Sequence, residues 1–186
     1  LQTDRIIEAL DSDEIDVGIL ATPVEIPKMF ELPLYYEPFY VLCKKNHEYA
    51  HHKKIKYSSL KRNDIWLLQE GHCLRHQVLD VCSSKKGQDE NRKFKFESGS
   101  LETLKNLVES YGGYTLLPSL ATEGLSPQTQ LIPFERPIPA REIGLVYRRE
   151  HYKNDLIQVL AEAITKSIPE EVRKIRQKDL DVIPIK

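Results

Sequence analysis

Cysteine is scarce in this sequence, and long hydrophobic runs are absent from it. The three cysteines, Cys43, Cys73 and Cys82, are an odd number and too few for the disulfide framework of a small secreted domain. No apolar run approaches the ~20 residues that span a bilayer. The opening residues 1–4 lack the charged-then-apolar layout of a signal peptide. We therefore expect a soluble, cytoplasmic protein with no membrane partner.

The sequence also lacks an excess of charge of either sign. It holds 27 lysines and arginines against 28 aspartates and glutamates, which gives a formal net charge of −1. It therefore has no basic field that would attract the phosphate backbone of a nucleic acid. Any binding to DNA is expected to lie outside this chain. Because the sequence opens on Leu1 rather than Met, and at once with helix-like residues, it resembles a fragment.

What the sequence does contain is an ordinary globular composition. Hydrophobic residues make up 40% and charged residues 30% of the 186 residues, enough to bury a core. Strand-like and helix-like periods alternate along the chain. We predict helices that begin near residue 3 and cover 72–83, 101–110 and 154–167, and strands or extended segments at 15–21, 30–36, 39–44, 65–68, 94–97, 114–117 and 141–148. This alternation predicts an α/β fold with substantially parallel sheets.

Local signals predict where several helices begin and end. Thr3 or Asp4 can cap the first helix, and Ser100 can cap the helix at 101–110, which Gly112 and the next glycine should stop. The tail after Pro169 is expected to form one more helix through residue 178. The helix at 154–167 is expected to turn one apolar stripe inward, composed of Leu156, Ile157, Leu160 and Ile164.

The segment 44–57 gathers lysines and three histidines, His47, His51 and His52. The spacing of these histidines fits no closed set of metal ligands. A solvated loop is the simpler interpretation. We expect neither a metal nor a cofactor in this chain.

The informative segment is 70–82, where Cys73 follows a glycine turn at the expected start of a helix, with His72, Arg75 and His76 beside it. A helix N-terminus and nearby cations stabilise a thiolate, the form that attacks peroxides and disulfides. Cys73 is therefore a candidate reactive thiol. A buried structural cysteine is the alternative that these residues leave open.

Cys82 follows Cys73 by nine residues. On a regular helix nine steps give ~13.5 Å of rise and leave the two side chains about half a turn apart. A disulfide needs Cα atoms closer than about 7 Å, so the pair can bond only if the helix unwinds. The spacing is typical of a switch rather than of a structural staple. The polar stretch 83–91 would resist such a rearrangement little.

At this point the sequence resembles a known family. The run 70–75 with a second cysteine at Cys82, followed by residues 100–106 and 115–118, is similar to OxyR, the family of hydrogen-peroxide-sensing LysR-type transcription regulators. The resemblance implies a two-lobed, periplasmic-binding-protein-like regulatory domain. Its first lobe would comprise residues 1–37 and 141–170, incomplete at its start, and its second lobe residues 38–140. A C-terminal tail, 171–186, follows, and the DNA-binding domain is absent from this chain.

The resemblance also implies roles for five residues. Cys73 would be the peroxidatic cysteine, oxidised to a sulfenic acid, and Cys82 the resolving cysteine that condenses with it to a disulfide. Thr3 would help hold peroxide between the lobes, and His72 would assist beside the cysteine. Arg141 matches the arginine that stabilises the thiolate in the family.

Other residues match the family less well. Arg136 is close enough in sequence to compete with Arg141 for its role. Arg75 follows the cysteine in the same motif, and we expect it on the helix surface. His76 replaces an acidic residue of better-known relatives. Cys43 has no redox role in the family and is expected to be a buried strand residue.

The resemblance implies a redox-switched transcription regulator, not an enzyme. Its partners would be hydrogen peroxide, a thiol reductant such as glutaredoxin, RNA polymerase, and copies of itself in a homodimer or homotetramer. Promoter DNA would be bound only through the absent N-terminal domain. Two alternatives stay open: a LysR-type effector-binding module that holds an anion at helix N-termini near Ser100 and Cys73, and a thiol peroxidase that turns over with Cys73 and Cys82.

Overall fold

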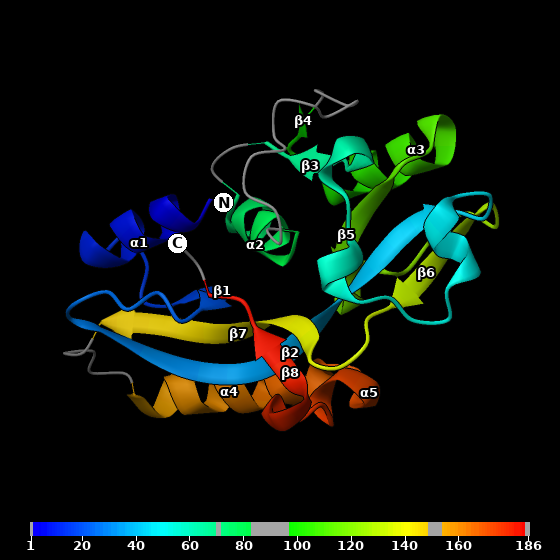
Figure 1. Ribbon diagram of the computed structural model, residues 1–186. Coiled ribbons are helices and arrows are strands. Elements are labelled where there is room, and N and C mark those ends of the chain that lie inside the picture. Colours follow the sequence, from blue (N-terminus) through cyan, green and yellow to red (C-terminus); the bar gives the residue numbers. More distant parts are fainter. Residues whose placement is uncertain (1, 70–71, 83–96, 149–153, 185–186) are drawn as a thin grey trace.

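Two long strands, β2 (Met29–Lys44) and β7 (Ile138–Arg148), run through the centre of the computed structural model (Figure 1). The structure describes residues 2–69, 72–82, 97–148 and 154–184. The other strands are β1 (Gly18–Thr22), β3 (Leu67–Leu68), β4 (Glu97–Ser98), β5 (Tyr114–Pro118), β6 (Thr129–Pro133) and β8 (Leu180–Val182). The helices are α1 (Thr3–Asp11), α2 (Cys73–Val81), α3 (Leu101–Tyr111), α4 (Asn154–Ser167) and α5 (Glu170–Arg173).

β2 belongs to two sheets in turn. Its first part pairs with β7, up to Pro38 opposite Ala140. From Phe39 onward it pairs with β5 on one side and β6 on the other. We call the sheet of β1, β7, β8 and the start of β2 lobe I, and the sheet of β5, β6 and the end of β2 lobe II. The expected extended segments that carry the chain between lobes are confirmed, although they form one continuous strand.

The two-lobed α/β class is confirmed, but the prediction of substantially parallel sheets is wrong. The pairs β1–β7, β2–β7, β2–β5 and β2–β6 are all antiparallel. Among the described strands only β3–β4 and β7–β8 are parallel. The reason is that β2 and β7 cross between the lobes in opposite directions. Hydrophobic periodicity identifies strands but carries no information on their direction.

The largest core lies in lobe II, where α2 and α3 contribute apolar side chains around β5 and the end of β2. It includes Phe39, Val78, Leu104, Val108 and Leu117. α3 ends at Gly112, as predicted, because that residue has a φ of 77°, in the left-handed region that favours glycine. The indole N–H of Trp66 donates to the carbonyl of Gly112 at 2.7 Å and so satisfies one end of the helix.

The predicted inward stripe of α4 is partly wrong. Ile157 and Ala161 are buried against lobe I, whereas the side chain of Leu156 is 63% exposed. Leu156 lies one residue, about 100°, from Ile157 around the helix and so falls outside the buried stripe. Val159 of the same helix is 64% exposed.

Several predicted element ends also change. Gln2, rather than Thr3 or Asp4, is the N-cap of α1, and Ser100 is the N-cap of α3 without a capping bond from its side chain. The predicted tail helix ends at Arg173, because the chain turns into β8 beside β7. Predicted strand residues 94–96 and the polar stretch 83–91 lie outside the described residues. Within the described part, no helix is long and apolar enough to cross a membrane.

Candidate redox site

α2 carries one of the two cysteines of the motif at each end. The helix begins at Cys73, after His72, which is its N-cap in an extended conformation. The side chain of Cys73 is partly exposed and its thiol is free. The helix start predicted at this cysteine is therefore confirmed. The first N–H groups of a helix have no partner within the helix, so the thiol lies beside the positive end of the helix dipole.

Cys82 occupies the other end of α2, as its C-cap residue, and it is buried. It forms no disulfide, and its Sγ lies 3.8 Å from the hydroxyl of Tyr114. Nine residue steps along the helix lead from Cys73 to Cys82, a rise of ~13.5 Å. No disulfide can form between them while α2 is intact, because bonded cysteines need Cα atoms within about 7 Å.

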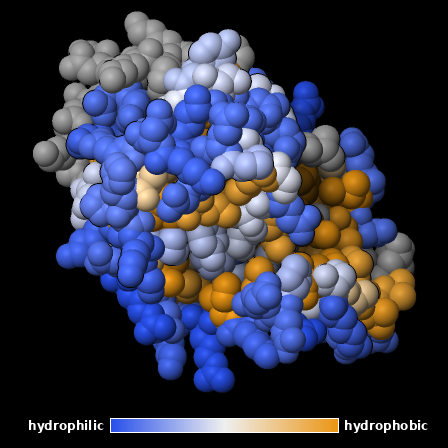
Figure 2. Space-filling model, turned by 90° about the vertical axis from the view of Figure 1, so that its right-hand side faces the viewer, coloured by the Kyte–Doolittle hydropathy of each residue, from blue (hydrophilic) through white to orange (hydrophobic). Residues whose placement is uncertain are grey.

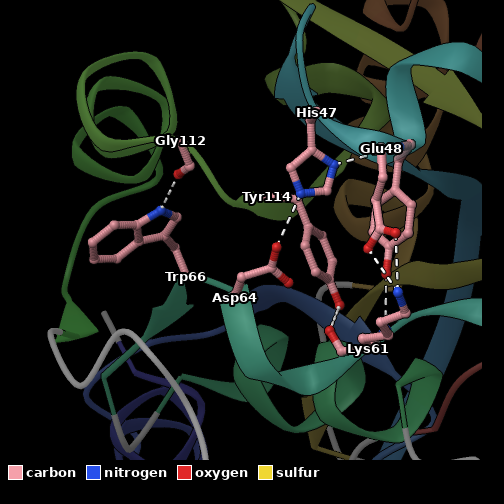
Figure 3. A network of polar contacts seen from close by, with 8 residues as sticks. His47, Glu48, Lys61, Asp64, Trp66, Gly112 and Tyr114 are labelled. Carbon is pink, nitrogen blue, oxygen red and sulfur yellow. Dashed lines mark hydrogen bonds and ion pairs between the residues drawn. The ribbon is translucent and has the colours of Figure 1, made fainter.

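A polar cluster lies inside lobe II (Figure 3), and its Tyr114 is the tyrosine that the Sγ of Cys82 approaches. The hydroxyl of Tyr114 donates to the carbonyl of Lys61 at 2.6 Å, and the N–H of Lys61 donates to the hydroxyl of Tyr49 at 2.9 Å. His47 accepts from the N–H of Tyr49 on Nδ1, at 3.1 Å, and its Nε2 lies 3.0 Å from Asp64. A ring that accepts on Nδ1 carries its proton on Nε2, so His47 donates from Nε2 to the Asp64 carboxylate.

Burial raises the pKa values of two acidic side chains in this region, the hydroxyl of Tyr114 and the thiol of Cys43. Desolvation, followed by the proximity of Cys82, raises the pKa of Tyr114, so its hydroxyl stays a donor. Desolvation also raises the pKa of Cys43 to about 12, and the carboxylate of Asp64 adds to the effect. Cys43 is fully buried in β2. The prediction of a buried strand residue is confirmed, and a thiol with such a pKa supplies almost no thiolate near neutral pH.

Arg75 does not lie on the helix surface, so that prediction is wrong. It is 8% exposed, and its guanidinium donates to the carbonyl of Leu68 at 2.7 Å. The long apolar stem of arginine packs in a core while the head reaches a backbone acceptor. Arg75 thereby ties the first turn of α2 to the end of β3. Arg75, the second residue after Cys73, falls on the buried side of the helix, which the sequence alone did not indicate.

Arg141 lies where β7 crosses between the lobes, and it is held by a carboxylate. Its Nε donates to Oε2 of Glu37 at 2.8 Å and its Nη2 lies 2.7 Å from the same oxygen. Glu37 is 1% exposed, and its Oε1 accepts from the N–H of Leu120 at 2.9 Å. Arg136, the competing residue, pairs at 3.3 Å with Asp179 and has a side chain that is 72% exposed. The partly buried Arg141 is therefore the arginine built into the crossing.

The five predicted site residues come from three parts of the fold. Thr3 is in the first turn of α1, His72 and the two cysteines are on α2, and Arg141 is on β7. Within the described part of the chain, no hydrogen bond or ion pair links the side chains of Thr3, His72, Cys73 and Arg141 to one another. Their joint action in one site stays a prediction.

Sequence reasoning missed Glu37 and Gln77 as site residues. Glu37 precedes a proline in a strand and gave no sign that its carboxylate is buried. Gln77 is 0% exposed on α2, and its amide donates at 2.8 Å to the carbonyl of Ile183. A glutamine on a helix is ordinarily a surface residue, so only the position of the tail reveals its role.

No metal centre is evident in the described ranges, which contain no group of three or more histidine, cysteine, aspartate or glutamate side chains that could hold an ion. His47 belongs to the polar cluster of lobe II, not to the solvated loop predicted for residues 44–57, which contains a 3₁₀ turn at Glu48–His51. His51 and His52 are exposed.

Comparison with known proteins identifies the class to which this fold and site belong. Residues 1–168 match the family model of the LysR substrate-binding domain, so the chain belongs to that family. A crystal structure of OxyR from Porphyromonas gingivalis superimposes with a TM-score of 0.83 at 31% identity, covering 98% of this chain and 83% of that one. The predicted resemblance to the OxyR family is confirmed.

Two further relatives agree. The hydrogen peroxide-inducible genes activator of Haemophilus influenzae is 33% identical over 176 residues, 94% of this chain and 56% of that protein. A hydrogen-peroxide-bound cysteine-to-serine mutant of OxyR from Corynebacterium glutamicum has a TM-score of 0.79 at 30% identity, covering 89% of this chain and 53% of that one. The chain therefore spans about half the length of the curated relatives that it matches.

Proposed function

We propose that this chain is the regulatory domain of a peroxide-responsive transcription activator, in which Cys73 and Cys82 form a reversible disulfide. The observation that carries the proposal is the placement of two cysteines, neither in a disulfide, at opposite ends of one helix: a partly exposed one at its N-terminus and a buried one at its C-cap. The similarity to hydrogen peroxide-inducible activators supports the choice of oxidant.

The chemistry has two steps. The Cys73 thiolate attacks one oxygen of hydrogen peroxide, so an S–O bond forms and the O–O bond breaks, leaving a sulfenic acid and hydroxide, which takes up a proton. α2 then opens, and the Cys82 thiolate attacks the sulfenic sulfur, so the S–S bond forms and the S–O bond breaks, releasing hydroxide, which takes up a proton to become water. A dithiol reductant such as glutaredoxin returns both cysteines to thiols and is itself oxidised.

The remaining roles are part of the same proposal. Thr3 and His72 hold peroxide beside Cys73, and Arg141 supports the thiolate from the crossing of the lobes, with Glu37 fixing its position. The opening of α2 changes the packing of subunits in a homodimer or homotetramer. DNA and RNA polymerase are contacted in the whole regulator, which works in the cytoplasm, where reductants keep thiols reduced. Each oxidation of the protein consumes one equivalent of hydrogen peroxide, and in this proposal the protein is a sensor rather than an enzyme with sustained peroxide turnover.

Apolar surface is available for subunit contacts. On the face drawn in Figure 2, hydrophobic residues gather across the middle and at the lower right, among predominantly hydrophilic ones. Among the exposed large apolar side chains of the described chain are Leu156 and Val159, both on α4. Contiguous apolar patches are typical of association surfaces.

The test is peptide mass spectrometry of the purified 186-residue chain after one equivalent of hydrogen peroxide. We expect a Cys73–Cys82 disulfide, with Cys43 left as a thiol. Cys73→Ser should prevent the reaction, and Cys82→Ser should leave a sulfenic acid on Cys73 that a dimedone probe traps. Cys43→Ser is the matched control and should leave the pairing unchanged. Three equally slow thiols would contradict the proposal, and sustained peroxide consumption with added glutaredoxin would indicate a peroxidase.

A further inference from the structure

The C-terminal tail contacts the helix that carries the cysteines. β8 pairs in parallel with the start of β7, where Ala140 lies opposite Val182. In Figure 1 β8, drawn in red, lies beside the strands that cross between the lobes. The next residue, Ile183, continues from β8 toward lobe II and joins the core that also contains Val78 and Cys82.

Ile183 makes a hydrogen bond on each side of its backbone. Its N–H donates to the carbonyl of Ala140 at 2.8 Å, next to the arginine that Glu37 holds. Its carbonyl accepts from the side-chain amide of Gln77 at 2.8 Å. Residue 183 therefore connects the strand that crosses between the lobes directly to α2.

The contact between Gln77 and the tail depends on α2 being helical, because Gln77 is part of this helix. It lies one turn after Cys73, so the two residues share a face of the helix, and it is 0% exposed. Among the described residues its Oε1 is buried without a hydrogen-bond partner. Within that part of the chain, the bond from the amide nitrogen to the carbonyl of Ile183 is the hydrogen bond that the Gln77 side chain makes.

We propose that residues 180–183 form a strap that holds α2 in its helical form, with Gln77 as the positioning residue that fastens the helix to Ile183. The second half of the inference rests on the proposed function: when the Cys73–Cys82 disulfide opens α2, Gln77 leaves Ile183 and the strap loosens from β7. A contact made only in the helical state favours that state, and the opened state must weaken the contact by the same factor.

Amide exchange of the reduced chain tests the first half without peroxide. Gln77→Leu keeps the volume and removes the donor, and we expect α2 amides to exchange about fivefold faster, as for the loss of one buried hydrogen bond. A chain ending at Asp179 also loses the burial of Ile183 and should exchange about tenfold faster or more. A chain ending at Pro184 keeps the strap and is the matched control.

If α2 exchange stays within about twofold of the parent in both Gln77→Leu and the chain ending at Asp179, the tail does not hold the helix. Faster exchange in the shortened chain alone would overturn the role of Gln77. Should the chain ending at Asp179 fail to melt cooperatively, Gln77→Leu alone decides. Gln158→Leu, on the exposed side of α4, controls for the amide-to-apolar change and should leave α2 exchange unaltered.

The second half of the inference, the release of Gln77 from Ile183, is tested by amide exchange of peroxide-treated protein. We expect the N–H of Ile183 to lose protection in the disulfide form, and Gln77→Leu to form the disulfide faster while sulfenic acid appears on Cys73 at the parent rate. Full protection of Ile183 in the disulfide form would refute release. If the parent forms no Cys73–Cys82 disulfide, the proposed function fails, and the strap is still decided by the exchange of the reduced chain.

Discussion

If α2 must open before the disulfide forms, as we propose, then weakening the packing of α2 against the core should accelerate disulfide formation. Leu74, Val78, Val81 and Cys82 are all at most 5% exposed. Exposing four such side chains costs roughly 6 kcal/mol or more, so fewer than about one molecule in 10⁴ has the helix open. In the proposed switch, the disulfide step is therefore limited by the open population, and we expect any substitution that raises this population to raise the rate of disulfide formation.

Val78→Ala tests this quantitatively. It removes two buried carbons, about 1.6 kcal/mol, of which the better helix propensity of alanine returns about 0.5. The net change of about 1 kcal/mol should raise the rate of disulfide formation about fivefold. Rapid mixing with peroxide, acid quenching and peptide mass spectrometry measure this rate, and a sulfenic acid probe measures the first step, which should not change.

Val108→Ala is the matched control. Val108 is 0% exposed, lies in the same core as Val78 and is also on a helix, so its substitution lowers global stability by a similar amount. It leaves the packing of α2 against the core largely intact. Equal acceleration in both variants would mean that the disulfide forms through global unfolding. No acceleration in Val78→Ala, with the expected loss of stability, would refute the opening of α2.

Two predictions concern buried groups outside α2. Glu37→Gln leaves Arg141 without its carboxylate partner and should cost about 2–4 kcal/mol in urea unfolding, whereas Glu162→Gln, in an exposed pair, should cost under about 0.5. Cys43 keeps its proton in the fold, where its pKa is about 12, but ionises above about 9 when unfolded. Stability should therefore fall as pH rises from 9 to 12, and Cys43→Ala should reduce that slope by about 1.4 kcal/mol per pH unit.

The sequence predicted the local elements well because their signals are local. Helical periodicity places α3 and α4, and a double glycine stops α3. The direction of strands was mispredicted because β2 and β7 owe their pairing to residues a hundred positions apart, and no local pattern carries that information. Leu156 was misplaced for a related reason: the centre of a buried stripe depends on which sheet the helix meets.

In the candidate site, the sequence indicated the reactive cysteines more clearly than the buried polar residues that hold α2 in place. Cys73 and Cys82 could be proposed from the sequence because thiols are rare, and their positions at the two ends of α2 agree with the spacing argument. Arg75 and Gln77 were misjudged or missed because both are polar residues whose burial depends on a distant backbone carbonyl, that of Leu68 or of Ile183. A single sequence gives the donor but not the acceptor.

The polar cluster of lobe II bears on the cost of the opened state. The hydroxyl of Tyr114 lies near Cys82 but donates to the carbonyl of Lys61, a shorter contact that does not involve α2. When Cys82 leaves, Tyr114 therefore keeps its main hydrogen bond, and so does the pair of His47 with Asp64. Opening α2 then exposes apolar surface and breaks the contacts of Arg75 and Gln77, but the buried hydroxyl of Tyr114 keeps its hydrogen bond to the carbonyl of Lys61. Since apolar exposure raises the heat capacity, the equilibrium between thiol and disulfide forms should depend on temperature in a curved rather than a linear way.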